Sequence, residues 1–251
     1  EANALALSGA GRRRVLVSAI EHPSVLAGSA AAPDAARIPV DGDGVVDFAA
    51  LEELLAASPE PALVSVMLAN NETGVIQPVA KIADLARRFG ALVHCDAVQA
   101  AGKIAVDMRV LGVHLMSLSG HKFGGPMGAG ALIVDDAVAL AALIRGGGQE
   151  RGRRSGTENV SGIAGMGAAA QAARTALGDF AKLAALRDDM EARVLAATPT
   201  ARIVGRNAAR LPNTSCLALS GLPAETQVMA LDLAGVAVGA GAACSSGKTK
   251  A

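Results

Sequence analysis

The first 140 residues alternate between short, continuous apolar runs and segments whose apolar positions recur at helical spacing. Continuous apolar runs of five or six residues are typical of strands that are covered on both faces of a parallel sheet. The segment 78–90 instead places its apolar side chains on one stripe and ends at a glycine, which predicts a helix. This alternation predicts an α/β fold. The expected strands are 15–20, 63–68, 91–96, 113–118 and 129–134.

The pattern changes after about residue 156, where small residues and longer helical stripes become frequent. A mixture of helices and short strands in this part predicts an α+β unit. We therefore expect a large domain over residues 1–174 and a smaller domain over residues 175–251. The expected helices are 159–176, 180–197 and 223–234, and the expected strands are 202–204 and 215–219.

The composition of the 251-residue chain narrows the functions that the protein can have. Apolar residues make up 51%, which is enough for a core. The 23 Lys and Arg are balanced by 23 Asp and Glu, and this argues against a nucleic-acid partner. Trp and Tyr are absent, which disfavours aromatic platforms for bases or sugars. No uninterrupted apolar run reaches the roughly 18 to 20 residues of a membrane span, so we expect no membrane insertion.

The three cysteines form neither a disulfide framework nor a zinc-binding pattern, so we expect a cytoplasmic protein without a metal site. The chain begins at Glu1, without an initiator Met or a basic leader before an apolar core, and it ends in a polar segment. We expect it to be a fragment that is cut at both ends.

A lysine follows the expected strand 113–118 almost directly, in the segment SLSGHKFGGP. A lysine at a strand end, among hydrogen-bonding groups, can form a Schiff base if its pKa is lowered. Here that lysine is Lys122, and the hydroxyl of Ser119 and nearby backbone N–H groups could hold a phosphate. An exposed lysine in a turn is the alternative. The segment lacks the GxxxxGK[ST] pattern, which excludes a P-loop.

Three further strands are followed by polar side chains. Asp96 closes the strand 91–96, and a carboxylate there could keep a pyridine nitrogen protonated or simply cap a helix. Asn71 and His22 could likewise contact a ligand or belong to turns. The carboxyl ends of parallel strands lie at one edge of a sheet, so these side chains should lie together. The expected group is His22, Asn71, Asp96, Gln99, Ser119, His121 and Lys122.

A cysteine near the C-terminus stands among Gly, Ala and Ser in the segment GAGAACSSGK. An accessible thiol near cations is a candidate nucleophile, and this one is Cys244. Cys95 and Cys216 fall within expected strands and are predicted to be core residues. The Gly- and Arg-rich loop 146–157 could bind an anion or contact a second subunit, and a solvated loop is the alternative.

Six segments occur in the order that is found in cysteine desulfurases: EHPSV, NNETGV, HCDAVQ, SLSGHKFGGPMG, GGGQERGRRSGTEN and GAACSSGK. Over nearly its whole length the chain resembles these pyridoxal phosphate (PLP) enzymes of the class V aminotransferase group, which have fold type I. The resemblance implies a large domain with a mainly parallel, seven-stranded sheet covered by helices, and a smaller α+β domain. It also implies a phosphate-binding Thr before residue 1 and a carboxylate-binding Arg beyond residue 251.

The resemblance implies roles for individual residues. Lys122 would bind PLP covalently and remove the substrate Cα proton, Asp96 would pair with the pyridine nitrogen, and His22 would stack on the ring. Cys244 would take the sulfur of L-cysteine as a persulfide and leave L-alanine. Gln99 would contact the ring hydroxyl, and Asn71 would lie near that oxygen and the substrate carboxylate. Ser119 and His121 would hold the phosphate, and Thr157 would reach the phosphate of the other subunit of a homodimer.

The expected function is therefore a PLP-dependent cysteine desulfurase that supplies a sulfur acceptor, such as an iron–sulfur scaffold. A thiolate is a suitable sulfur acceptor, and a loop can carry it to and from the substrate. A selenocysteine lyase and a class V aminotransferase are alternatives, although ordinary aminotransferases lack the Cys244 loop. A catalytically impaired fragment that serves as an assembly surface is a third alternative.

Overall fold

The computed structural model describes residues 1–241. Its centre is a six-stranded sheet with the strand order β2-β1-β3-β4-β5-β6. The first five strands in this order are parallel, and β6 pairs antiparallel with β5. The strands are β1 Arg14–Ser18, β2 Asp34–Ile38, β3 Leu63–Met67, β4 Leu92–Asp96, β5 Leu115–Ser119 and β6 Gly130–Val134.

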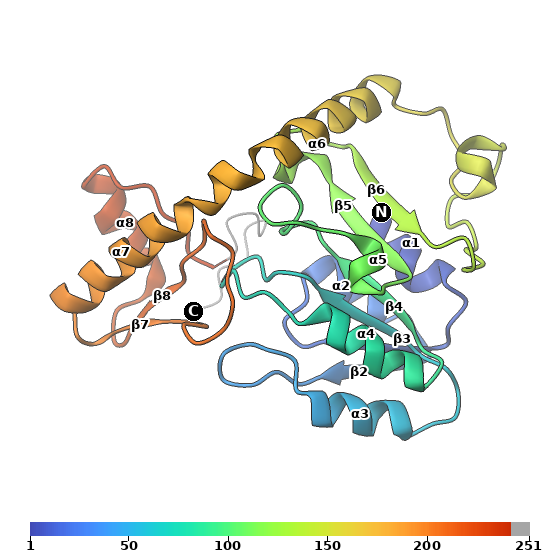
Figure 1. Cartoon of the computed structure of the whole chain (residues 1–251), viewed down its shortest axis with the longest axis horizontal. Helices are drawn as coiled ribbons and strands as arrows, with labels where there is room; N and C mark the ends of the chain where they lie inside the picture. The colour runs from blue at the N-terminus through green and yellow to red at the C-terminus, as the bar shows by residue number, and fades with distance from the viewer. Residues whose placement is uncertain (242–251) are drawn as a thin grey trace.

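Helices cover both faces of this sheet (Figure 1). One face packs against α1 Ala2–Gly9 and α2 Pro23–Ser29. The other packs against α3 Phe48–Ala56, α4 Val79–Arg88 and α5 Met108–Leu111. All residues of β1 and β3 are buried, as the continuous apolar runs predict. The α/β class is confirmed.

The described sheet has six strands, whereas the resemblance implies seven. The last strand is antiparallel because only a short connection, which includes the 3₁₀ helix η1 Gly120–Lys122, joins β5 to β6. A parallel return would need a crossover of about a dozen or more residues. A second 3₁₀ helix, η2 Gln149–Gly152, lies in the long loop after β6.

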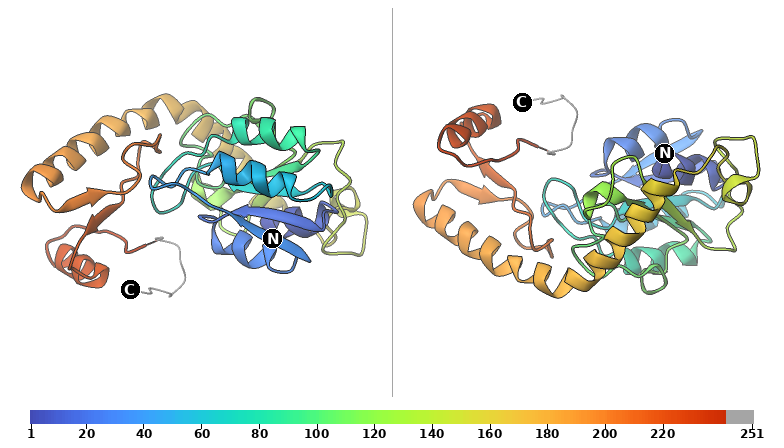
Figure 2. Two further views of the ribbon diagram at one scale, coloured as in Figure 1. Left: turned by 90° about the horizontal axis from the view of Figure 1, so that it is seen from below. Right: turned by 90° about the horizontal axis from the view of Figure 1, so that it is seen from above.

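A long helix, α6 Val160–Ala181, leads from the sheet to a smaller α+β region, and the views from below and from above agree on this arrangement (Figure 2). We call residues 183–241 the C-terminal region. It contains α7 Leu183–Ala197, β7 Ala201–Ile203, β8 Leu217–Leu219 and α8 Ala224–Leu233, and β7 pairs antiparallel with β8. The expected boundary between residues 174 and 175 falls inside α6. None of the helices within residues 1–241 has the length and apolar character to cross a membrane.

The prediction for Cys216 is wrong. This residue comes one position before β8 and is half-buried, whereas Cys95 lies within β4 and is buried. β8 belongs to a two-stranded sheet and exposes most of its residues, so its neighbourhood does not form a core.

Candidate active site

A cavity of about 1430 Å³ opens at the carboxyl ends of β1, β3, β4 and β5. Parallel strands end at the same sheet edge, and this brings polar residues from distant parts of the chain together. The cavity is lined by all eight of the candidate residues that lie before residue 242: His22, Asn71, Asp96, Gln99, Ser119, His121, Lys122 and Thr157. Cys244 lies outside the described residues.

The turn that carries Lys122 is closed by a backbone hydrogen bond that a glycine permits. Lys122 ends η1, directly after β5, and is half-buried. The backbone N–H of Gly125 donates to the carbonyl oxygen of Gly120 at 2.8 Å. A Cβ atom at position 125 would lie 3.0 Å from that oxygen, so the glycine allows the chain to close this turn. The turn holds Lys122 at the carboxyl end of β5.

Anion-binding groups line the cavity beside this turn. The hydroxyl Oγ of Ser119 lies 2.9 Å from Nδ1 of His121. Hydroxyl and imidazole groups can donate hydrogen bonds to phosphate oxygens, and guanidinium groups add positive charge. Three arginines of the loop after β6 line the same cavity: Arg151, Arg153 and Arg154.

The carboxylate of Asp96 is buried at the end of β4 and held at both oxygens. Its Oδ1 accepts a hydrogen bond from the backbone N–H of Val98 at 3.0 Å. Its Oδ2 accepts one from Nδ2 of Asn3 at 2.7 Å. The two bonds fix the orientation of the carboxylate toward the cavity that Asp96 lines.

Asn3 connects Asp96 to His22 through Ser24. Nδ2 of Asn3 also donates to Oγ of Ser24 at 2.9 Å, and that Oγ lies 2.8 Å from Nδ1 of His22. The backbone N–H of Ser24 donates to the same Nδ1 at 3.2 Å. An Nδ1 that accepts leaves the ring proton of neutral His22 on Nε2. Ser24 lies in the segment EHPSV but received no predicted role, and Asn3 was not predicted because no strand end or motif marks it.

His94 lies two residues before Asp96 and is fully buried in β4. Its Nδ1 and Nε2 lie 2.8 Å and 2.9 Å from the hydroxyls of Ser65 and Ser117, respectively. Burial lowers the pKa of His94 to about 4, while the nearby Asp96 acts in the opposite direction. A neutral His94 therefore cross-links β3, β4 and β5 beneath the site.

Glu21 is a buried acid that the sequence analysis also missed. It precedes His22, and one of its carboxylate oxygens accepts a hydrogen bond from the backbone N–H of Met67. Burial, and then the negative charge of Asp96, raise the pKa of Glu21 well above its ordinary value. The contact ties the loop that carries His22 to the end of β3.

Comparison with known proteins places these features in a family. The aminotransferase class-V family matches residues 1–250. A cysteine desulfurase from Cereibacter sphaeroides is 48% identical over 94% of this chain and 61% of its own length. The cysteine desulfurase NifS from Azotobacter vinelandii is 39% identical over 94% of this chain and 60% of its own length.

The solved structures agree. A NifS-like protein from Rickettsia africae superimposes with a TM-score of 0.89 and 37% identity, over 96% of this chain and 67% of that protein. A structure described as SspA in complex with cysteine gives a TM-score of 0.76 and 28% identity, over 93% and 67% of the two chains. This chain thus spans about three fifths of the curated relatives. On the family match, on identities above 30% and on the shared fold, the chain belongs to the class-V aminotransferase family.

Proposed function

We propose that the protein is a PLP-dependent cysteine desulfurase, which converts L-cysteine to L-alanine and keeps the sulfur as a persulfide on Cys244. One observation carries the proposal: Lys122, Asp96 and His22 line a single cavity at the sheet edge. The names of the relatives, cysteine desulfurase and NifS, support the same reaction. The cysteine bound to the SspA structure supports the substrate.

The residues present fit PLP. A phosphate needs donors, which Ser119, His121 and the arginines offer, and a pyridinium nitrogen needs a carboxylate, which Asp96 offers. Oδ1 of Asn3 is buried and lacks a partner among the described residues, so an additional polar group at this site would be accommodated. Within residues 1–241 no three His, Cys, Asp or Glu side chains are grouped to hold a metal.

When bound, PLP supplies an electron sink that makes loss of the substrate Cα proton possible. The side chains of this chain then have separate tasks. The Nζ atom of Lys122 would accept the Cα proton, and Asp96 would hold the proton on the ring nitrogen. His22 would cover one face of the ring, and Asn71 and Gln99 would orient oxygen atoms of the ring and substrate.

The sulfur step needs an accessible thiolate. Burial raises the pKa of the Cys95 thiol well above its ordinary value, and burial also raises the pKa of the Cys216 thiol. Neither is suited to act as a thiolate at neutral pH, which leaves Cys244 as the favoured nucleophile. Its sulfur would form a bond to the substrate sulfur as the Cβ–Sγ bond breaks. The electron pair stays on carbon, which takes up a proton to give alanine, so no external oxidant is needed.

The proposal includes partners. We propose a cytoplasmic homodimer in which Thr157 contacts the phosphate in the partner subunit, and a sulfur acceptor such as an iron–sulfur scaffold. The exposure of Thr157 in the single chain is compatible with such a contact. Sedimentation with and without PLP tests the dimer, and persulfide transfer to a purified scaffold tests the acceptor.

The decisive experiment is an assay of sulfide and alanine from L-cysteine, run beside L-selenocysteine. We expect equal amounts of alanine and sulfide with a thiol reductant present. Lys122→Ala should reduce both by about 10³-fold. Cys244→Ala should keep the cofactor absorbance and release no sulfide, whereas the matched variant Cys216→Ala should behave like the wild type. Normal sulfide release by Cys244→Ala would overturn the persulfide step.

A further inference from the structure

We propose that residues 205–214, which we call the strap, position Asn71 for substrate binding by pairing with the loop after β3. The strap belongs to the C-terminal region and lies about 140 positions from that loop in the sequence. The inference rests on the proposed function, because it assigns the strap a role in binding L-cysteine.

Backbone hydrogen bonds join the strap to the loop like two short strands. The N–H of Ile76 donates to the carbonyl oxygen of Ala209 at 2.7 Å, and the N–H of Leu211 donates to that of Gly74 at 2.8 Å. Val75 and Arg210 form an antiparallel bridge between them. The Leu211 side chain is 1% exposed and packs in the core of the sheet region. The strap is thereby an integral part of the sheet region's packing.

The same loop carries Asn71, and its other side is also fixed. Oδ1 of Asn70 accepts hydrogen bonds from the backbone N–H groups of Glu72 and Thr73, each at 2.9 Å. Nδ2 of Asn70 donates to the carbonyl oxygen of Ile20 at 3.0 Å. Asn71 is thus held between a side-chain-capped turn and the strap, and a shift of the strap would move it.

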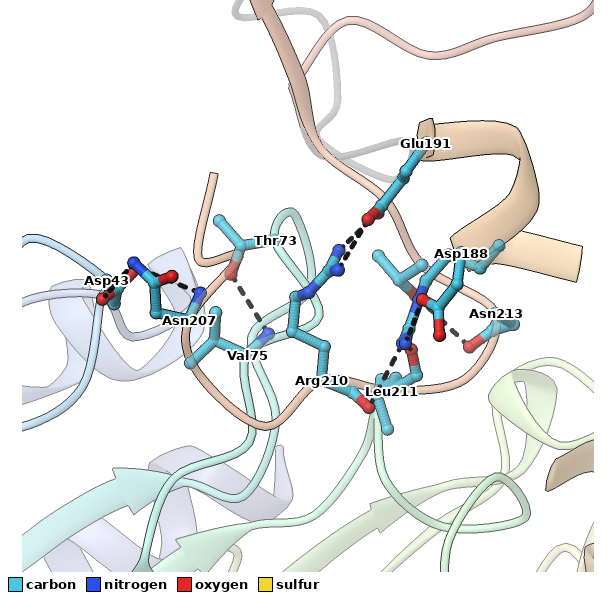
Figure 3. A network of polar contacts seen from close by, with 11 residues as sticks. Asp43, Thr73, Val75, Asp188, Glu191, Asn207, Arg210, Leu211 and Asn213 are labelled. Atoms are coloured by element: carbon cyan, nitrogen blue, oxygen red, sulfur yellow. Dashed lines mark hydrogen bonds and ion pairs between the residues drawn. The ribbon is translucent and has the colours of Figure 1, made fainter. Parts of the chain in front are cut away.

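Side-chain contacts with α7 and with the loop that carries Asp43 hold the strap in place (Figure 3). Arg210 makes two hydrogen bonds to the carboxylate of Glu191 on α7, at 2.6 Å and 2.8 Å. Arg187 on α7 donates to the carbonyl oxygen of Leu211 at 2.6 Å. Nδ2 of Asn207 lies 3.3 Å from both carboxylate oxygens of Asp43. The strap is therefore fixed to α7 at one end and to the sheet region at the other.

The end of the strap reaches the cavity, where Asn213 and Thr214 line its wall. Thr214 also packs against Gly74, which has φ +74: a Cβ atom at position 74 would lie 2.7 Å from Cβ of Thr214. Gly90 has a similar φ of +64, and among the described atoms none would lie within 4 Å of its Cβ. Replacing either glycine with alanine therefore causes similar backbone strain. Only at position 74 does the new Cβ atom also collide with the strap.

This difference gives a matched test in the whole protein. Gly74→Ala should raise KM for L-cysteine about tenfold with kcat changed less than about threefold, because lost substrate binding appears in KM. The cofactor should stay bound, because Lys122, Asp96 and the proposed phosphate-binding side chains lie outside the loop that carries Asn71. Gly90→Ala should keep the wild-type KM. The double variant Gly74→Ala/Thr214→Gly lacks the side chain that the new Cβ atom would hit. Its KM for L-cysteine should therefore return most of the way to the wild-type value.

A second readout does not depend on activity. In the cofactor-free protein, amide hydrogen exchange of the peptides 70–77 and 205–214 should accelerate in Gly74→Ala and not in Gly90→Ala. Equal KM and equal exchange in the two variants would overturn the role of the strap. If the wild type released no sulfide, the proposed function would fail instead, and the exchange comparison would still decide whether the strap orders the Asn71 loop.

Discussion

The sheet region and the C-terminal region bury their apolar side chains to very different extents. Every residue of β1 and β3 is buried. Along α8 no buried residue is found among the described positions, and Leu233 at its end is 90% exposed. Two hydrophobic clusters fill the two faces of the sheet, whereas the C-terminal region contributes Leu211 of the strap to one of them. The sheet region thus gains its stability from burial of apolar area.

The C-terminal region is held differently. Within it, the ion pair of Arg210 with Glu191 and the bond from Arg187 to the strap backbone join the strap to α7. Across its junction with the sheet region, backbone hydrogen bonds join the strap to the loop after β3. The candidate site lies between these two kinds of structure. Its sheet wall carries Asp96 and Lys122 on a rigid edge, and its other wall is held by a few directional bonds. This difference teaches that the two walls of the candidate site are stabilised by different forces, apolar burial on one side and directional polar contacts on the other.

The largest expected effect comes from truncating a leucine to alanine in each of the two regions. Leu16 on β1 is 0% exposed. Leu16→Ala should lower the free energy of unfolding by about 4 kcal/mol, because it removes buried methyl groups and leaves a cavity. Leu233→Ala should change it by less than about 0.5 kcal/mol. Urea unfolding, followed by circular dichroism, measures both, and equal losses would refute the contrast between the two regions.

The next effect concerns the ion pair that holds the strap. The side chains of Glu191 and Arg210 are 7% and 5% exposed, so Glu191→Ala leaves a buried cation and should cost about 3 kcal/mol. Asp189→Ala on the same helix, which removes an exposed pair with Arg193, should cost less than about 0.5 kcal/mol. Hydrogen exchange should show the loss in the C-terminal region first. If amide protection were lost evenly over the sheet region as well, the two regions would not be stabilised separately.

The same pair has a defined pH dependence. The hydrogen bonds from Arg210 lower the pKa of Glu191 below its ordinary value. An acid with a lowered folded-state pKa contributes stability that is present above the unfolded-state pKa of about 4.5 and is lost as the pH falls through the lower value. The wild type should therefore have a higher free energy of unfolding than Glu191→Gln near neutral pH, and this difference should shrink below about pH 4.5. Urea unfolding of both proteins over a range of pH measures it.

His94 provides a smaller effect that is confined to the sheet region. Its pKa is lowered to about 4 by burial, so the unfolded chain takes up a proton below about pH 6.5 and the folded chain does not. This difference should cost the folded protein about 2 kcal/mol between pH 7.5 and pH 5. His94→Asn should flatten that slope in unfolding titrations, at the cost of lower stability at pH 7.5. A slope that His94→Asn leaves unchanged would exclude the residue as its source.

The sequence predicts the fold where burial leaves a local pattern. β1, β3 and β4 lie within two residues of their expected bounds because strands buried on both faces require continuous apolar runs. β2 was not predicted: it lies at the sheet edge and has a largely exposed sequence, so no apolar run marks it. The helix α1 was also missed, since its small side chains give no clear stripe.

The residues of the candidate site likewise divide into those that a local sequence pattern marks and those that it does not. Residues at or shortly after the ends of parallel strands, such as Asp96 and His22, were predicted because topology alone brings strand ends together. Asn3 reaches Asp96 from α1, and Thr214 reaches the cavity from the strap. Both arrive through tertiary packing between segments far apart in the sequence, and no local spacing encodes that approach.

The smallest expected effect is the loss of the side-chain cap of α3, and it tests whether this helix opens only together with the core of the sheet region. Asp47 caps α3: its Oδ1 accepts hydrogen bonds from the backbone N–H groups of Ala49 and Ala50, at 2.9 Å and 3.1 Å. Asp47→Ala should cost about 1 kcal/mol, because two helix N–H groups lose their acceptor. Glu53→Ala, at an exposed position of the same helix, should stay within about 0.5 kcal/mol of the wild type.

The loss should appear in the global unfolding of the sheet region, since α3 buries Leu51 and Leu55 in the main core and cannot fray without opening it. Along α7 and α8, by contrast, no side-chain cap is found among the described residues, so their first turns should exchange amide hydrogens through local opening. If Asp47→Ala accelerated exchange in the first turn of α3 and left the urea midpoint unchanged, α3 would open as freely as α8. The contrast between a core-stabilised region and a contact-held region would then fail at this helix.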